Sequence, residues 1–201
     1  MVMPDHQLIG EFSATYLIEH GHRDILTLMC LRRKTMEMRL NGIREAWADH
    51  NMIFDDSRHL VATSGFGATE AREAISAYFS TCPTEGRPTA ILAGGDFMAV
   101  GAQEALEKLG LSFPGDISIM SMDVFDLAEI HAVPLTAVHV PRDELGGEAL
   151  RLLQQRLLRP NAPCCSLLLG GRLVVRSSVK RIGSRKVKAA ISSRNHGLYG
   201  N

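Results

Sequence analysis

The sequence has no long hydrophobic run. No apolar stretch in the 201 residues approaches the ~20 residues that a membrane-spanning helix needs. The first ten residues, MVMPDHQLIG, also lack the basic start and the apolar core of a secretory signal peptide. Hydrophobic residues make up 45% of the chain and charged residues 22%, which is typical of globular domains. We therefore expect no membrane partner and a cytoplasmic location.

Cysteine is scarce, and its spacing excludes the common structural zinc sites. The four cysteines are Cys30, Cys82, Cys164 and Cys165. None has metal-type spacing, and reduced thiols fit a cytoplasmic protein best. His20 and His22 have no third ligand nearby, so a metal site is poorly supported. There is also no convincing Ser/His/Asp or Cys/His set and no phosphate-binding loop, so we expect neither an enzyme nor a metal or other cofactor.

Acidic residues are absent from the last quarter of the chain. No Asp or Glu follows Glu148, whereas 11 lysines and arginines do, so the net charge of zero conceals an acidic beginning and a basic end. A basic end can attract nucleic acid, but chain termini are commonly solvated. We expect residues 181–201 to form a disordered basic tail, able to give only salt-sensitive, sequence-blind attraction to DNA.

The central stretch is residues 89–111, TAILAGGDFMAVGAQEALEKLGL. Its short apolar run suits a buried parallel strand, and two glycines end that run. Asp96 stands where the N-cap of a helix belongs, and Gly110 suits a left-handed C-terminal cap. The apolar face of the predicted helix consists of Met98, Ala102, Ala105 and Leu109. Strand, glycine turn and capped helix are half of a βαβ unit.

Strands and helices alternate on both sides of this stretch. Further strands are predicted at 24–29, 58–63, 117–122, 136–140 and 173–175, and helices at 7–19, 36–47, 69–79 and 141–158. This alternation argues for a parallel sheet with right-handed crossovers. The predicted fold class is α/β with a doubly wound parallel sheet.

The central stretch also carries a family resemblance. Residues 93–123, AGGDFMAVGAQEALEKLGLSFPGDISIMSMD, closely resemble the effector-binding domain of the lactose/galactose-repressor (LacI/GalR) regulators, particularly purine-repressor-like members. Four more segments fit the family in the same order: YLIEHGHRDILTL, RLNGIREA, PLTAVHVPRDELGGEALRLL and LVVRSSV. The resemblance covers roughly residues 2–179. It implies a periplasmic-binding-protein-like (type I) sensor domain that works as a homodimer.

The resemblance further implies a sensor that is truncated at its N-terminus. Family members normally begin with a helix-turn-helix headpiece and the first part of a two-lobed sensor, which these residues do not match. We assign residues 1–180 to the sensor. Its C-terminal lobe is expected at about 21–131 and 165–180, and the remnant of its N-terminal lobe at about 1–20 and 132–164. The strand after Pro134 is then expected to lack sheet partners, and the helix at 141–158 to expose apolar side chains.

Candidate ligand-binding residues come from the rule that open α/β sheets bind ligands outside the carboxyl ends of their strands. Arg39 follows the first predicted strand, and its guanidinium offers forked donors to hydroxyls, a carboxylate or a purine oxygen. The family resemblance implies that the arginine at this position contacts the effector, assisted by the counterparts of Arg33 and Thr35. The alternative is an arginine that is simply solvated.

Two further candidates follow other strands. Phe66 lies in a glycine-flanked loop, where the family places an aromatic ring that stacks on the ligand; the alternative is a hydrophobic plug. Asp123 can accept hydrogen bonds from vicinal hydroxyls or ring N–H groups; the alternative is a helix cap. Ser121 and Met122 precede it where the family usually has glycine and an aromatic residue. Asp96 is interpreted as a structural helix cap.

The resemblance therefore implies a ligand-sensing domain of a transcriptional regulator. Its effector would be a small polar metabolite, namely a sugar, a sugar phosphate or a purine. Operator DNA would be bound only through a headpiece that these 201 residues do not contain. A free-standing sugar-binding protein of the same fold is the alternative, and the missing signal peptide argues against it.

Overall fold

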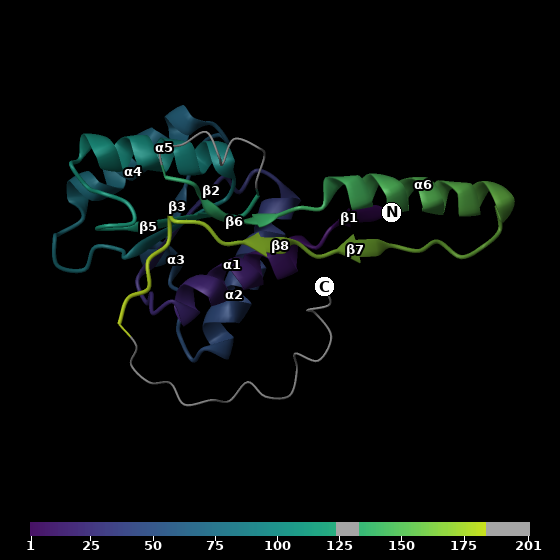
Figure 1. Ribbon diagram of the computed structural model, residues 1–201, viewed down its shortest axis with the longest axis horizontal. Helices are drawn as coiled ribbons and strands as arrows, with labels where there is room; N and C mark the ends of the chain where they lie inside the picture. The colour runs from purple at the N-terminus through teal and green to yellow at the C-terminus, as the bar shows by residue number, and fades with distance from the viewer. Residues whose placement is uncertain (124–132, 184–201) are drawn as a thin grey trace.

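The computed structural model describes residues 1–123 and 133–183, and its main body is built on a six-stranded sheet (Figure 1). The strands of this sheet are β2 (Ile25–Met29), β3 (Leu60–Ala62), β4 (Ala90–Ala93), β5 (Ser118–Ser121), β6 (Thr136–His139) and β8 (Arg172–Val174), in the order β3-β2-β4-β5-β6-β8. The first five are parallel, and β8 pairs antiparallel with β6. The predicted α/β fold with a parallel sheet is confirmed.

Helices cover both faces of this sheet. Helices α1 (His6–Glu19) and α2 (Lys34–Asp49) lie on one face, and α4 (Ala68–Thr81) and α5 (Asp96–Lys108) lie on the other (Figure 1). Successive strand residues point to opposite faces. In β4, Leu92 therefore joins the core under α1 and α2, while Ile91 joins the core under α4 and α5. Burial on both faces explains why the strands read as continuous apolar runs.

Helices α1 and α2 cross at two glycines. A Cβ atom on Gly10 would lie 2.0 Å from the carbonyl oxygen of Arg39, and one on Gly42 would lie 1.9 Å from the carbonyl oxygen of Gln7. No side chain fits at either distance, so glycine permits this close approach. The crossing brings the start of α1 against the part of α2 that carries Arg39.

Several local predictions differ from the structure. Within the predicted strand at 58–63, residues 58 and 59 instead end the short helix α3 (Asp56–His59), because the Asp55 side chain accepts a hydrogen bond from the Ser57 amide and caps a turn. Gly95, not Asp96, is the N-cap of α5; Asp96 is its first residue, and its carboxylate bonds to the Ser121 hydroxyl instead. Leu109 is exposed beyond the end of α5, whereas Gly110 takes the predicted left-handed conformation at φ +71°.

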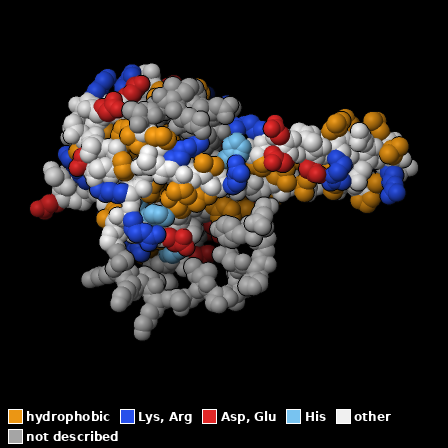
Figure 2. Space-filling view, viewed as in Figure 1, with side chains coloured by type: hydrophobic (Ala, Val, Ile, Leu, Met, Phe, Trp, Pro, Cys, Tyr) orange, Lys and Arg blue, Asp and Glu red, His pale blue; other side chains and the backbone are white. Residues whose placement is uncertain are grey.

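Helix α6 (Arg142–Leu158) extends from the main body as an arm, together with β1 (Val2–Pro4) and β7 (Leu167–Leu169) (Figure 1). Strands β1 and β7 pair in parallel as a separate two-stranded sheet. No residue of α6 is buried, and Leu150, Leu153 and Leu157 are 56%, 54% and 71% exposed. Apolar side chains along the arm are visible in Figure 2. The predicted apolar exposure of this helix is confirmed.

The prediction that the strand after Pro134 lacks sheet partners is wrong. Strand β6 pairs with β5 on one side and with β8 on the other, and its Val138 is fully buried. The late strand β8 returns antiparallel and closes the edge that was expected to be open. Helix α1, which was expected in the N-terminal remnant, packs against α2 and the main sheet. The exact boundary between two lobes stays a prediction.

Two other expectations concern the C-terminal tail and the membrane. The predicted basic tail lies outside the described residues, apart from its first three positions. Within residues 1–123 and 133–183, none of the helices has the length and apolarity needed to cross a membrane.

Candidate functional site

The predicted site residues lie at one edge of the main sheet. Arg33, Thr35 and Arg39 follow the carboxyl end of β2, Phe66 follows β3, and Asp123 follows β5. Because the strands run parallel in the order β3-β2-β4-β5, these ends meet at the same edge. Open α/β sheets bind ligands at this edge.

Arg39 is the most deeply placed of these residues. Its side chain is only 2% exposed. Its Nη1 donates to the carbonyl oxygen of Gly94 at 2.8 Å, its Nε to His6 Nδ1 at 3.3 Å, and its Nη2 to Asp123 Oδ2 at 3.4 Å. The alternative of a simply solvated arginine is therefore wrong. Three partners on three segments fix the guanidinium before any ligand arrives.

His6 acts in this cluster as a neutral acceptor. Burial lowers the pKa of His6, and the neighbouring charge of Arg39 lowers it further. A neutral imidazole has one acceptor nitrogen, and here Nδ1 takes the Arg39 hydrogen bond, which leaves the proton on Nε2. Burial also lowers the pKa of Arg39, whereas the carboxylate of Asp123 raises it. His6 and Asp123 thus support a buried cation from two sides.

Asp123 provides the partly open carboxylate of the site. Its side chain is 24% exposed, and a second guanidinium, that of Arg142, donates from Nη2 to Oδ1 at 2.7 Å. The alternative of a helix cap for Asp123 concerns residues that lie outside the described part of the chain. Asp123 is instead the common partner of two arginines.

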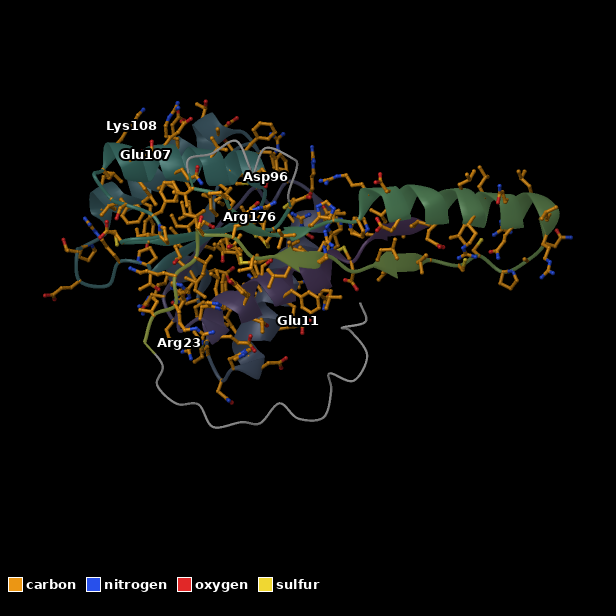
Figure 3. All side chains as sticks on the ribbon, in the orientation of Figure 1. Glu11, Arg23, Asp96, Glu107, Lys108 and Arg176 are labelled. Atoms are coloured by element: carbon orange, nitrogen blue, oxygen red, sulfur yellow. The ribbon has the colours of Figure 1, made fainter. Side chains whose placement is uncertain are left out.

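The hydroxyl of Ser121 organises the loop before Asp123. It lies 3.0 Å from Oδ1 of the buried Asp96 and 3.0 Å from the backbone oxygen of Asp123, and its single proton serves one of these at a time. Asp96 lies at the end of the main body from which the arm extends (Figure 3). Ser121 stands where the family usually has glycine, and here it ties β5 to the start of α5.

Arg33 and Phe66 form a second pair at the same edge. The Arg33 guanidinium lies over the Phe66 ring, 4.3 Å from its centroid, which is cation–π geometry. Phe66 is half-buried and packs against both core clusters, so it fills a gap and also presents a ring to the loop after β2. Thr35 lies half-buried in the first turn of α2. The structure thus joins Arg39 to Asp123 and Arg33 to Phe66.

Two residues of the cluster were not predicted. Arg142 follows β6 as Arg39 follows β2, so the strand-end rule could have found it, but the segment was assigned to the other lobe. His6 carries no local signal, because its approach to Arg39 depends on the α1–α2 glycine crossing.

Within the two described ranges, no set of three or more His, Cys, Asp and Glu side chains is arranged to hold a metal ion. Both ring nitrogens of His22, one of the two histidines considered as metal ligands, are instead hydrogen-bonded, to the Thr89 hydroxyl and to the Lys180 carbonyl oxygen.

Comparison with known sequences gives clear relatives. Residues 14–179 match the model of the periplasmic binding protein-like domain family. The chain is 31% identical over 174 residues to the HTH-type transcriptional repressor PurR of Vibrio campbellii, covering 86% of this chain and 51% of that protein. It is 33% identical over 171 residues to PurR of Salmonella arizonae, covering 85% and 49%. The chain thus spans about half the length of the curated relatives it matches.

Solved structures agree with these relatives. A LacI family transcriptional regulator from Enterococcus faecium with bound ribose is 26% identical with a TM-score of 0.79, and the match covers 90% of this chain and 66% of that one. A transcription regulator from Lactobacillus plantarum shares the fold, with a TM-score of 0.81 at 22% identity, over 90% of this chain and 68% of that one. Fold and family match together define a periplasmic binding protein-like domain. Within that class, the chain belongs to the LacI/GalR family and corresponds to part of its effector-binding domain.

Proposed function

We propose that this chain is the ligand-sensing part of a transcriptional regulator and that it binds a small polar metabolite at the Arg39–Asp123 pair. The observation that carries this proposal is a guanidinium 2% exposed beside a carboxylate 24% exposed, at the carboxyl edge of the sheet. A buried arginine offers fixed donors, and the carboxylate accepts hydrogen bonds from hydroxyl or ring N–H groups. A ligand with both kinds of group fits this pair.

The proposed ligand class is a sugar, a sugar phosphate or a purine. Phe66 supports a flat or ring-shaped ligand, because an aromatic face stacks on sugar and base rings. Arg33, which lies over that ring, adds a charge for polar substituents. Relatives point the same way, since the Enterococcus faecium regulator holds ribose. Arg33, Thr35, Arg39, Phe66 and Asp123 are the proposed binding residues.

The wider role is proposed from the family. We propose that ligand binding controls a DNA-binding headpiece outside these 201 residues and that the regulator works as a cytoplasmic homodimer. Operator reading needs a recognition helix presented at fixed spacing in a dimer. The named relatives are transcriptional repressors, which supports a sensor without enzymatic activity.

Calorimetry tests the site. Wild-type protein is titrated with ribose, ribose 5-phosphate, adenine and guanine, and the binding compound is then titrated into Arg39→Ala and Asp123→Ala. Each variant should lose about tenfold or more in affinity, because an unpaired polar group costs ~1–3 kcal/mol. Arg151→Ala is the matched control, since this arginine lies on α6 and pairs with Glu148. Unchanged affinity in both site variants would rule out the assignment.

A further inference from the structure

One feature of the site is unlike a simple open pocket: both oxygens of Asp123 are already engaged. On its buried side, Oδ2 faces Arg39, which is 2% exposed; on its exposed side, Oδ1 faces Arg142, which is 38% exposed. The bond from Arg142 is also the shorter of the two, at 2.7 Å against 3.4 Å. A ligand that donates to Oδ1 therefore competes with Arg142 for the carboxylate.

Arg142 is also the first residue of α6, the helix of the arm. The N-cap of α6 is Pro141, and no side chain caps its first turn. Two other arginines of α6 make contacts within the arm: Arg151 pairs with Glu148, and Arg156 donates to the carbonyl oxygens of Pro160 and Ala162. The pair of Arg142 with Asp123, in contrast, joins the base of the arm to the end of β5.

We propose that Arg142 is a ligand-displaceable latch, which holds Asp123 in the ligand-free protein and releases the base of α6 when an effector takes its place on Oδ1. The latch rests on the proposed function of the site, and it adds how binding is communicated. An effector hydroxyl or ring N–H that donates to Asp123 replaces one hydrogen bond of the carboxylate by another, so the carboxylate stays satisfied. The Arg142 guanidinium gives up Oδ1, and this ion pair between the start of α6 and the end of β5 is lost.

The energetics suit a displaceable contact. Arg39 is bound to the protein on three sides and cannot leave without exposing unpaired buried groups. Arg142 is more than a third exposed, so water hydrates its guanidinium when it leaves the carboxylate, and an ion pair with such an exposed partner contributes little to stability. The same carboxylate thus has one permanent and one exchangeable cation.

Affinity for an uncharged probe tests the displacement. Ribose and adenine are titrated by calorimetry into wild type, Arg142→Ala and the control Arg151→Ala. Uncharged probes exclude a direct loss of charge attraction. Because Arg142→Ala removes the competitor for Asp123, it should bind about two- to fivefold more tightly than wild type, while Arg151→Ala stays at the wild-type affinity. Equal or weaker binding by Arg142→Ala would overturn the latch while leaving the proposed site intact.

Hydrogen exchange tests, without any ligand, whether the ion pair of Arg142 with Asp123 holds the start of α6. Exchange at the amides of residues 145–147, the first backbone amides of α6 with a helical hydrogen bond, should be several-fold faster in Arg142→Ala and in Asp123→Asn than in wild type, with no change in Arg151→Ala. Unchanged exchange in both variants would overturn the latch whatever binds. If neither probe binds wild type or Arg142→Ala, the proposed ligand class fails, and the exchange result alone decides whether Arg142 ties the arm.

Discussion

At the scale of single residues, His22 shows how a buried histidine is held neutral. Its Nε2 lies 3.1 Å from the Lys180 carbonyl oxygen and its Nδ1 lies 2.9 Å from the Thr89 hydroxyl. A carbonyl only accepts, so Nε2 carries the proton and Nδ1 is the acceptor. Burial lowers the pKa of His22 from 6.5 to about 4. The neutral ring joins the end of the described chain to the start of β4.

This histidine predicts a loss of stability in acid. The unfolded chain binds the proton below pH 6.5, and the folded chain only below about pH 4, so the free energy of unfolding falls as the pH falls through that window. Between pH 7 and pH 4.5 this one group accounts for about 2.5 kcal/mol. Urea unfolding at both pH values should show a correspondingly smaller loss in His22→Gln than in wild type. An equal loss in the two proteins would show that His22 does not carry the effect.

Sequence reasoning found the site residues that obey a local rule. Asp123 could be predicted because it closely follows an apolar strand, and ligand sites lie at such ends. Arg39 lies inside the helix after β2, and the family resemblance singled it out. Their partners could not be read in the same way. His6 is 33 positions from Arg39, and its contact exists only because two helices cross at glycines. The contact between Arg142 and Asp123 required knowing that β6 lies beside β5.

At the scale of elements, the crossing of α1 and α2 is the contact most sensitive to a single methyl group. In Gly10→Ala the new Cβ would lie 2.0 Å from the Arg39 carbonyl oxygen, so the helices must separate. Overpacking of this kind typically costs ~1–3 kcal/mol. Gly146→Ala in α6 is the matched control, because a Cβ there meets nothing within 4 Å and alanine favours a helix.

Thermal or urea unfolding distinguishes the two variants. Gly10→Ala should be less stable than wild type, and Gly146→Ala should be equal or up to ~1 kcal/mol more stable. Ligand affinity should fall in Gly10→Ala as well, because the displaced backbone belongs to Arg39. Equal stability of Gly10→Ala and wild type would show that the crossing adjusts without cost.

The elements that could be predicted are those with strong local patterns. The apolar runs at 24–29, 89–93 and 117–122 are strands, shortened by one or two residues. Residues 58–63 are only partly a strand, because the Asp55 cap at their N-terminal side starts a helical turn instead. Strands β1 and β7 have three residues each and exist through pairing with each other, Val2 opposite Leu167, which no local pattern indicates.

At the scale of the whole molecule, the main body and the arm differ in how deeply their residues are buried. The four central strands of the main sheet are almost wholly buried, whereas α6 has no buried residue. Hydrogen exchange should therefore be slow at 25–29, 90–93, 118–121 and 136–139 and fast across 142–158, because exposed helices open locally at low cost. Protection of α6 equal to that of the sheet, in a monomeric protein, would mean that the arm is stabilised by contacts other than burial.

Binding of a polar metabolite at the carboxyl edge of the six-stranded sheet is the proposal on which the others depend. Amide chemical-shift mapping by NMR, with ribose and adenine titrated into wild-type protein, tests it most directly. The largest shifts should fall after β2, β3, β4 and β5, at Arg39, Phe66, Gly94 and Asp123. A different result would contradict it: no shift with either compound, or shifts confined to the 610 Å³ groove between α6 and residues 162–165.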